Sequence, residues 1–180
     1  AKKTLGLDPK RQLNDATLSE LKAKANEAYA DVAATGKRVT SDAFREDIYK
    51  ITDQTGAKSF PKDTPKAVEN LKRIYSNIKV FDAADAVAKI RQLRNDAKGN
   101  LKLDDPEKVA LGRAQRQVAD ALDAELARHV EALGKPELAA KYKAARVQWA
   151  KIHSVEDALE GGNVSARELS KQKARGVPLS

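Results

Sequence analysis

Two histidines are the side chains in this sequence best suited to acid–base or metal chemistry. His153 and Glu156 form a His-x-x-Glu step, a spacing that supplies metal ligands in di-iron helical bundles. Such a centre needs two of these steps and two further glutamates, whereas this chain has one candidate step. His129 falls one turn after Leu126 on an apolar helical stripe, so we interpret it as a core or seam histidine with a backbone or carboxylate partner. The histidines therefore predict no metal site.

The other side chains that could carry catalysis lack their partners in the sequence. A nucleophilic serine needs a base and an orienting acid, and no serine here lies in a glycine-rich elbow. The adjacent carboxylates Asp104 and Asp105 are explained as helix caps. Gly161 and Gly162 lack the surrounding pattern of a phosphate-binding loop. We therefore predict no catalytic residue and no cofactor. An enzyme that uses only surface carboxylates is the remaining catalytic alternative.

The basic side chains of this sequence are candidates for binding nucleic acid. The formal net charge is +8, and the excess gathers in residues 1–11 and 165–180. Basic ends and basic helix faces can hold phosphates by counterion release, without sequence specificity. The alternative is a solvated face with intrahelical ion pairs, and the absence of interleaved aromatic residues argues against base stacking. The candidate contacts to nucleic acid or to a partner are Arg91, Arg94, Lys98, Arg113, Arg116, Arg167, Lys171, Lys173 and Arg175.

Two of these residues, Arg113 and Arg116, lie on a long helical hairpin, at 104–160. Asp105 suits an N-cap and Pro106 the first helical position, while Gly134 suits the residue after a helix end and Pro136 starts the next helix. Because the turn is short, the two helices should be antiparallel neighbours. The first apolar stripe is Leu111, Ala114, Val118, Leu122, Leu126 and Leu133, and the second is Leu138, Tyr142, Ala145, Trp149, Ile152 and Leu159. The polar residues that fall off the first stripe are Arg113, Arg116, Asp120, Asp123 and Glu131.

Helical patterns also fill most of the chain before the hairpin. We expect an irregular basic arm at 1–16, a helix opened by the Thr17–Glu20 capping box, a second helix capped at Thr40 or Ser41, and a loop at 56–64. Helices follow from Thr64 and from Asp82, joined by a short connection at 80–81. Gly161–Asn163 should break the chain before a short last helix and a basic tail at 161–180.

Composition agrees with this pattern. The chain is rich in alanine, 33% of its residues are charged and only 4% are aromatic, which is typical of helices. Alternating runs of β-branched residues are lacking, so strands should be scarce or absent. Cysteine is absent, which excludes disulfides and thiolate ligands, and apolar runs are too short to predict a membrane span. The sequence predicts an all-α fold, a bundle of about six to seven helices organised on the hairpin, with the main domain at 17–160.

Several phrases resemble a known group of proteins: LRNDAKGNLK at 93–102, DPEKVALGRAQRQVADALDAEL at 105–126, GKPELAAKYKAAR at 134–146 and VEDALEGGNVSARELSKQKARGVPLS at 155–180. They resemble a helical region of virion structural, or virion-associated, proteins of tailed phages and prophages. The resemblance is most specific at GNVSARELSK. It implies a location in the virion after synthesis in the bacterial cytoplasm, other virion proteins as partners and a chain that continues beyond Ser180. It implies no catalytic residue.

The leading functional prediction is therefore a non-enzymatic structural and interaction module of a bacteriophage particle. Its partners would be other virion proteins or the remainder of its own longer chain, and oligomers are compatible with the pattern. The alternative is a helical protein that binds nucleic acid non-specifically and is packaged or delivered with the phage genome.

Overall fold

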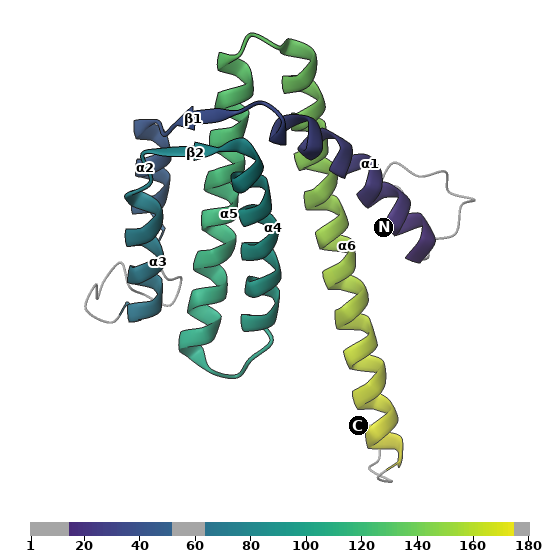
Figure 1. Cartoon of the computed structure of the whole chain (residues 1–180). Coiled ribbons are helices and arrows are strands. Elements are labelled where there is room, and N and C mark those ends of the chain that lie inside the picture. Colours follow the sequence, from purple (N-terminus) through teal and green to yellow (C-terminus); the bar gives the residue numbers. More distant parts are fainter. Residues whose placement is uncertain (1–14, 52–63, 175–180) are drawn as a thin grey trace. The chain divides into compact units, whose positions relative to one another are not determined.

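Helices dominate the structure, as the sequence predicts. The computed structural model describes the backbone of residues 15–51 and 64–174 and the side chains of residues 16–51 and 64–156. Within these ranges lie six helices and two short strands (Figure 1). The elements are α1 (Asp15–Ala33), β1 (Lys37–Val39), α2 (Asp42–Tyr49), α3 (Lys66–Ser76), β2 (Val80–Asp82), α4 (Ala83–Asn100), α5 (Pro106–Ala132) and α6 (Pro136–Ala174). The predicted arm at 1–16 and the predicted loop at 56–64 fall almost wholly outside the described residues.

The caps predicted at several helix starts are confirmed. Asp105 accepts a hydrogen bond from the Glu107 amide at 2.9 Å, ahead of Pro106 in the first turn of α5. Ser41 caps α2 through the Phe44 amide at 3.2 Å, and Asp82 caps α4. Each cap satisfies an amide that the first helical turn leaves without an intrahelical acceptor. Helix α1, in contrast, is already helical at Asp15, so the Thr17–Glu20 pattern does not mark its start.

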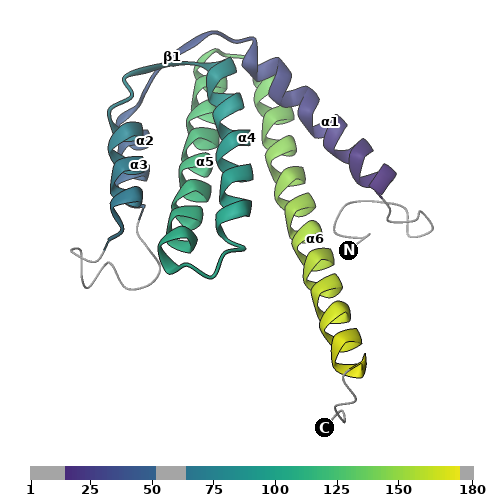
Figure 2. The ribbon, with the colours of Figure 1, turned by 60° about the horizontal axis from the view of Figure 1, so that its bottom comes forward.

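The chain divides into two compact units, and each is described by itself. The central unit is residues 28–143, and the terminal unit combines residues 1–27 with residues 144–180. In the central unit, α4 and α5 lie side by side along most of their length (Figure 2). Gly112 permits this approach, because a Cβ there would lie 2.9 Å from the Leu101 Cγ and 3.1 Å from the Ala97 carbonyl oxygen. After α5, Gly134 takes a positive φ of 67° and the chain reverses into α6, as the sequence predicts.

A small sheet completes the central unit. Strands β1 and β2 are antiparallel, with Arg38 opposite Phe81 and Val39 opposite Val80. Residues 80 and 81, expected only to connect two helices, therefore pair with a segment about forty residues earlier. Local periodicity cannot show this pairing, because three-residue strands are too short to carry an alternating pattern.

The predicted hairpin core holds only in part. Leu122, Leu126 and Tyr142 are buried in the central unit, as expected. Trp149 belongs to the other compact unit. It is partly buried and packs in the terminal unit against a cluster of Leu18, Ile152 and Val155. The predicted stripe residue Leu133 is exposed beside the turn.

Helix α6 also corrects the predicted break. It continues through Gly161, Gly162 and Asn163 to Ala174, so no separate short helix follows. A glycine weakens a helix by about 1 kcal/mol relative to alanine, and a helix with enough good helix formers can tolerate this cost. The flanking segments are rich in alanine, glutamate, leucine and lysine, all good helix formers. Among the described residues, none of the helices combines the length and apolar character needed to cross a bilayer.

Candidate functional site

Asp123 forms the first of two buried polar centres on α5. Its side chain is 2% exposed. The Tyr29 hydroxyl from α1 donates to its two carboxylate oxygens at 3.1 and 3.2 Å, and the Tyr142 hydroxyl from α6 donates to Oδ1. The Arg94 guanidinium from α4 lies 2.6 Å from Oδ2. One carboxylate therefore joins side chains from three other helices, and its charge is compensated by a cation and two hydroxyl donors.

The ionisation states of this centre follow from its burial. Burial, together with the negative charge of Asp123, raises the pKa of the Tyr29 hydroxyl above its ordinary value. Burial by itself would lower the pKa of Arg94, but the charge of Asp123, the contact with Tyr29 and the charge of Asp120 together outweigh burial, so the pKa is raised. Tyr29 thus stays neutral and Arg94 stays charged at neutral pH. The rings of Tyr29 and Tyr142 also meet edge to face, with centroids 5.1 Å apart, which further orients both hydroxyls.

Glu125 forms the second centre and is 0% exposed. Its Oε1 accepts from Arg38 of β1 at 3.0 Å and 2.7 Å, through Nε and Nη2. Its Oε2 accepts from the Ser41 hydroxyl at 2.7 Å, and that serine is the N-cap of α2. Arg128 bridges Glu125 to Asp47 of α2. The second carboxylate therefore fixes the strand β1 and the start of α2 against α5.

Sequence reasoning missed both centres. Asp123 lies off the predicted apolar stripe, and Glu125 is absent from it, yet both side chains are buried. A prediction based on one apolar stripe places the opposite face of the helix in water. Buried residues occur on all sides of the middle of α5 instead. A signal was present in the several alanines of this helix, since small side chains allow neighbours to pack on more than one face.

The two histidines have different surroundings. His129 is buried and its Nε2 lies 3.0 Å from the Thr35 hydroxyl, which confirms the seam interpretation but with a hydroxyl partner. Burial, and then the positive charge of Arg38, lower the pKa of His129 below its ordinary value. His153 stacks on Trp149 and has Nδ1 3.6 Å from Glu156. Among the described residues, no three potential ligands are grouped so that they could hold a metal ion.

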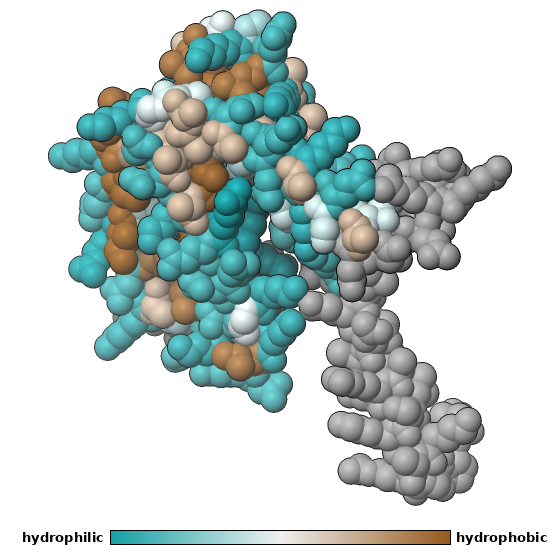
Figure 3. Space-filling model, turned by 45° about the vertical axis from the view of Figure 1, so that its right-hand side comes forward, coloured by the Kyte–Doolittle hydropathy of each residue, from teal (hydrophilic) through white to brown (hydrophobic). Residues whose placement is uncertain are grey.

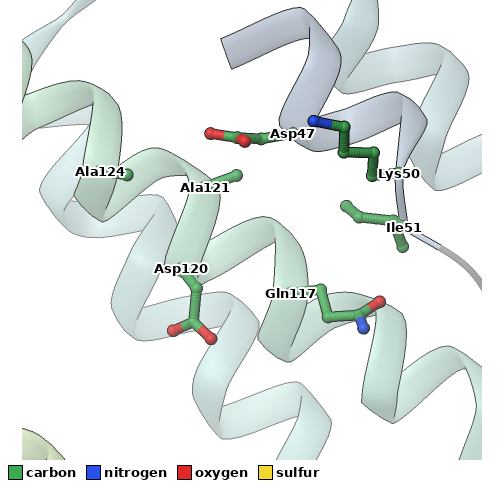
Figure 4. A pocket seen from close by; sticks show the side chains of 7 residues that line it. All are labelled: Asp47, Lys50, Ile51, Gln117, Asp120, Ala121 and Ala124. Carbon is green, nitrogen blue, oxygen red and sulfur yellow. The ribbon is translucent and has the colours of Figure 1, made fainter. Parts of the chain in front are cut away.

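A shallow hollow opens between the end of α2 and the middle of α5 (Figure 4). All three of its charged side chains have ion-pair partners, since Asp47 pairs with Arg128, Asp120 with Arg94 and Lys50 with Glu46. Figure 4 shows the Lys50 amine and the Asp120 carboxylate apart from one another, on different helices. This lining presents no nucleophile with an adjacent base. It comprises Asp47, Lys50, Ile51, Gln117, Asp120, Ala121 and Ala124.

The candidate basic contacts have different surroundings. Arg94 is committed to Asp123 and Asp120, at 2.6 and 3.3 Å, so the structure gives it an internal role. Arg91 and Lys98 of α4 and Arg116 of α5 are exposed, and Arg113 is half-buried. The side chains of Arg167, Lys171, Lys173 and Arg175 lie outside the described residues. The structure thus places the exposed central candidates on two neighbouring helices, and their relation to the C-terminal ones is not described.

Comparison with models of protein families, with curated proteins and with solved structures finds no match for this chain.

Proposed function

We propose that this chain is a non-enzymatic structural and interaction module of a bacteriophage particle. The observation that carries the proposal is the use of the two buried carboxylates on α5. Asp123 and Glu125 are enclosed by partners from α1, α4, α6, β1 and α2, and neither opens into a cavity lined by catalytic groups. The location in a phage particle is supported by the resemblance of four sequence segments to tailed-phage virion proteins.

Buried charge networks suit such a role because they favour one arrangement of the elements over others. Breaking a buried ion pair leaves an uncompensated charge and is strongly unfavourable, so the satisfied network resists rearrangement. A module with a fixed arrangement of helices presents its surface to a partner with little ordering cost on binding. In this proposal the polar centres preserve the geometry, and the partner is met elsewhere on the surface.

The test is the composition of purified particles. Virions produced by the phage or lysogen that encodes this chain would be purified by density gradient and quantified by mass spectrometry against their major capsid protein. We expect peptides of this chain in a constant ratio to capsid protein across the particle peak. Distribution with host proteins, away from the particle peak, would contradict the proposal.

A second candidate is non-specific binding of nucleic acid, favoured by the exposed Arg91, Lys98 and Arg116 on α4 and α5 and by the net charge of +8. Retention on duplex DNA should then fall steeply between about 50 and 200 mM salt, since each neutralised phosphate releases counterions. Replacing Arg91 and Arg116 with glutamine should reduce the salt slope. Absence of retention at about 50 mM salt would remove this candidate.

A further inference from the structure

The two-stranded ribbon has a hydrogen-bonding pattern that leaves one edge open. The Thr40 amide donates to the Lys79 carbonyl and the Ala83 amide donates to the Gly36 carbonyl, both at 2.9 Å. In an antiparallel ladder hydrogen-bonded and non-hydrogen-bonded pairs alternate, so Arg38–Phe81 is a hydrogen-bonded pair and Val39–Val80 is not. The backbone amide and carbonyl of Val39 therefore point away from β2. Within the described residues these two groups have no backbone partner.

The inner face of this ribbon is held firmly. Arg38 binds the buried Glu125, and the Phe81 ring meets Phe44 of α2 edge to face at 6.5 Å. The Thr40 hydroxyl donates to the Ile78 carbonyl at 2.8 Å, just beyond the strands. A two-stranded ribbon is marginal by itself, but these contacts hold its strands extended and in register.

The outer face is apolar and exposed. Side chains alternate along a strand, so Val39 projects opposite to Arg38. Val39 is 69% exposed and Val80, directly across the ribbon, is 52% exposed. Edge strands are commonly protected by short length, lysine, inward-pointing charges, proline or a bulge. Strand β1 is three residues long and carries Lys37 and the inward Arg38, which disfavour pairing with another basic edge, and it contains neither proline nor a bulge. Figure 3 shows apolar patches of this kind standing among a mainly hydrophilic surface on one face of the molecule.

We propose that the outer edge of β1 takes an extended segment of another protein as an added strand, with alternate apolar side chains over Val39 and Val80 and acidic residues beside them. This inference rests on the proposed function, because it names the surface through which the module would engage a partner. Main-chain groups give such an interaction its affinity, and the pockets for alternate side chains give its specificity.

The charges favour an acidic partner over a second copy of this chain. Lys37 is exposed and, two residues before Val39, lies on the same face of the ribbon, opposite Asp82 of β2, and the exposed Lys79 directly precedes β2. A second copy that paired through the same edge would bring another Lys37 and Arg38 to the ribbon, and that edge carries no carboxylate of its own. An acidic segment would meet the lysines with opposite charge instead.

The experiment uses the 15N-labelled 180-residue chain and the peptide acetyl-Glu-Val-Thr-Val-Thr-Glu-amide, titrated to about 5 mM, well into the range where a millimolar Kd is measurable. We expect shift changes at Lys37, Val39 and Val80. With a Kd of about 1 mM, exchange of the outward Val39 amide should slow about sixfold at about 5 mM peptide, and that of the inward Arg38 amide should change little. The same peptide N-methylated at alternate residues, which removes its strand donors, should not bind.

Two matched variants and a dilution series decide the result. Val39→Asp should weaken peptide binding at least about tenfold, since it places an acid against the acidic peptide, whereas Ile74→Asp on α3, at 58% exposure, should change it less than about twofold. Absence of ribbon shifts at 5 mM peptide, or equal effects of the two variants, would overturn the inference. Ribbon shifts that depend on protein concentration without peptide would overturn it in favour of self-association. Incorporation of Val39→Asp into particles at the wild-type ratio would also reject this surface while leaving the proposed function standing.

Discussion

At the scale of single residues, the structure depends on where ionisable groups are buried. Asp123 and Asp120 lie one turn apart on α5 and both contact Arg94, yet the first is enclosed by donors and the second faces water. The same ion-pair partner therefore serves a buried and an exposed carboxylate. Burial decides how much each pair contributes, because water screens the exposed pair and competes for its hydrogen bonds.

We expect Asp123→Asn to destabilise the folded chain by about 3–5 kcal/mol, since it leaves the Arg94 charge without its buried partner. The matched change Asp120→Asn should cost about 0–1 kcal/mol, as is typical of exposed pairs. Urea unfolding followed by circular dichroism measures both. Comparable costs for the two variants would show that Arg94 is not desolvated at Asp123.

His129 should make stability depend on pH. Its pKa in the folded chain is lowered by burial and by Arg38, so as the pH falls below the unfolded value of about 6.5 the unfolded state takes up the proton first. The contribution of this histidine is therefore fully present above about pH 6.5 and is lost towards acid pH. Between pH 7.5 and 5.5 the wild-type chain should lose more stability than His129→Gln, as measured by urea unfolding. If the stability of the wild-type chain and that of His129→Gln fall equally with pH, the loss arises from other ionisable groups.

At the scale of elements, α5 organises the central unit because neighbours can approach it closely on several sides. Its contact with α4 depends on the missing side chain of Gly112, which lies against Leu101 and Ala97. Its two buried carboxylates reach in different directions, one to α1, α4 and α6 and the other to β1 and α2. Helix α5 thus supplies both the apolar packing and the polar anchors of its neighbours.

Gly112→Ala and Gly99→Ala should change stability in opposite directions. A Cβ at Gly112 would press on Leu101 and on the Ala97 carbonyl, so we expect a loss of about 1–3 kcal/mol from overpacking. A Cβ at Gly99 meets no atom within 4 Å, so the better helix propensity of alanine should stabilise α4 by up to about 1 kcal/mol. Thermal unfolding of both variants checks the comparison, and stabilisation by Gly112→Ala would contradict the close contact.

At the scale of the whole molecule, two compact units share the long helices α1 and α6. The central unit buries Leu126 completely, whereas the cluster of the terminal unit consists of Leu18, Ile152 and Val155 with Leu21 and Trp149 partly buried against it. Ile152 of the terminal unit is as completely buried as Leu126, so the cost of truncating a large side chain should follow the exposure of that side chain.

Leu126→Ala should cost about 2–5 kcal/mol, because its side chain is wholly buried and truncation leaves a cavity. Trp149→Ala should cost less than the 3–5 kcal/mol typical of a buried tryptophan, since its ring is only partly covered. Chemical unfolding followed by circular dichroism suits both variants, because Trp149 is the sole tryptophan and its removal abolishes tryptophan fluorescence. A larger loss for Trp149→Ala would restore the prediction of one continuous core.

The sequence by itself determined the features that depend on neighbours along the chain. The caps at Ser41, Asp82 and Asp105 and the reversal at Gly134 arise from residues within a few positions of one another, and helical spacing likewise marks Leu122, Leu126 and Tyr142 as buried. Such features follow from backbone sterics and local hydrogen bonds, which a single segment contains.

Only the tertiary structure decided which polar side chains are enclosed. Asp123 is buried because Tyr29, Arg94 and Tyr142 bind it from three other helices. Glu125 is buried because Arg38 of β1 and Ser41 at the start of α2 bind it. The pairing of Val39 with Val80 and the packing of Trp149 against the cluster that contains Leu18 likewise depend on segments distant in the chain. The physical reason is that burial of a charge is tolerated only where distant partners compensate it, and sequence periodicity records the faces of a helix but not the identity of what packs on them.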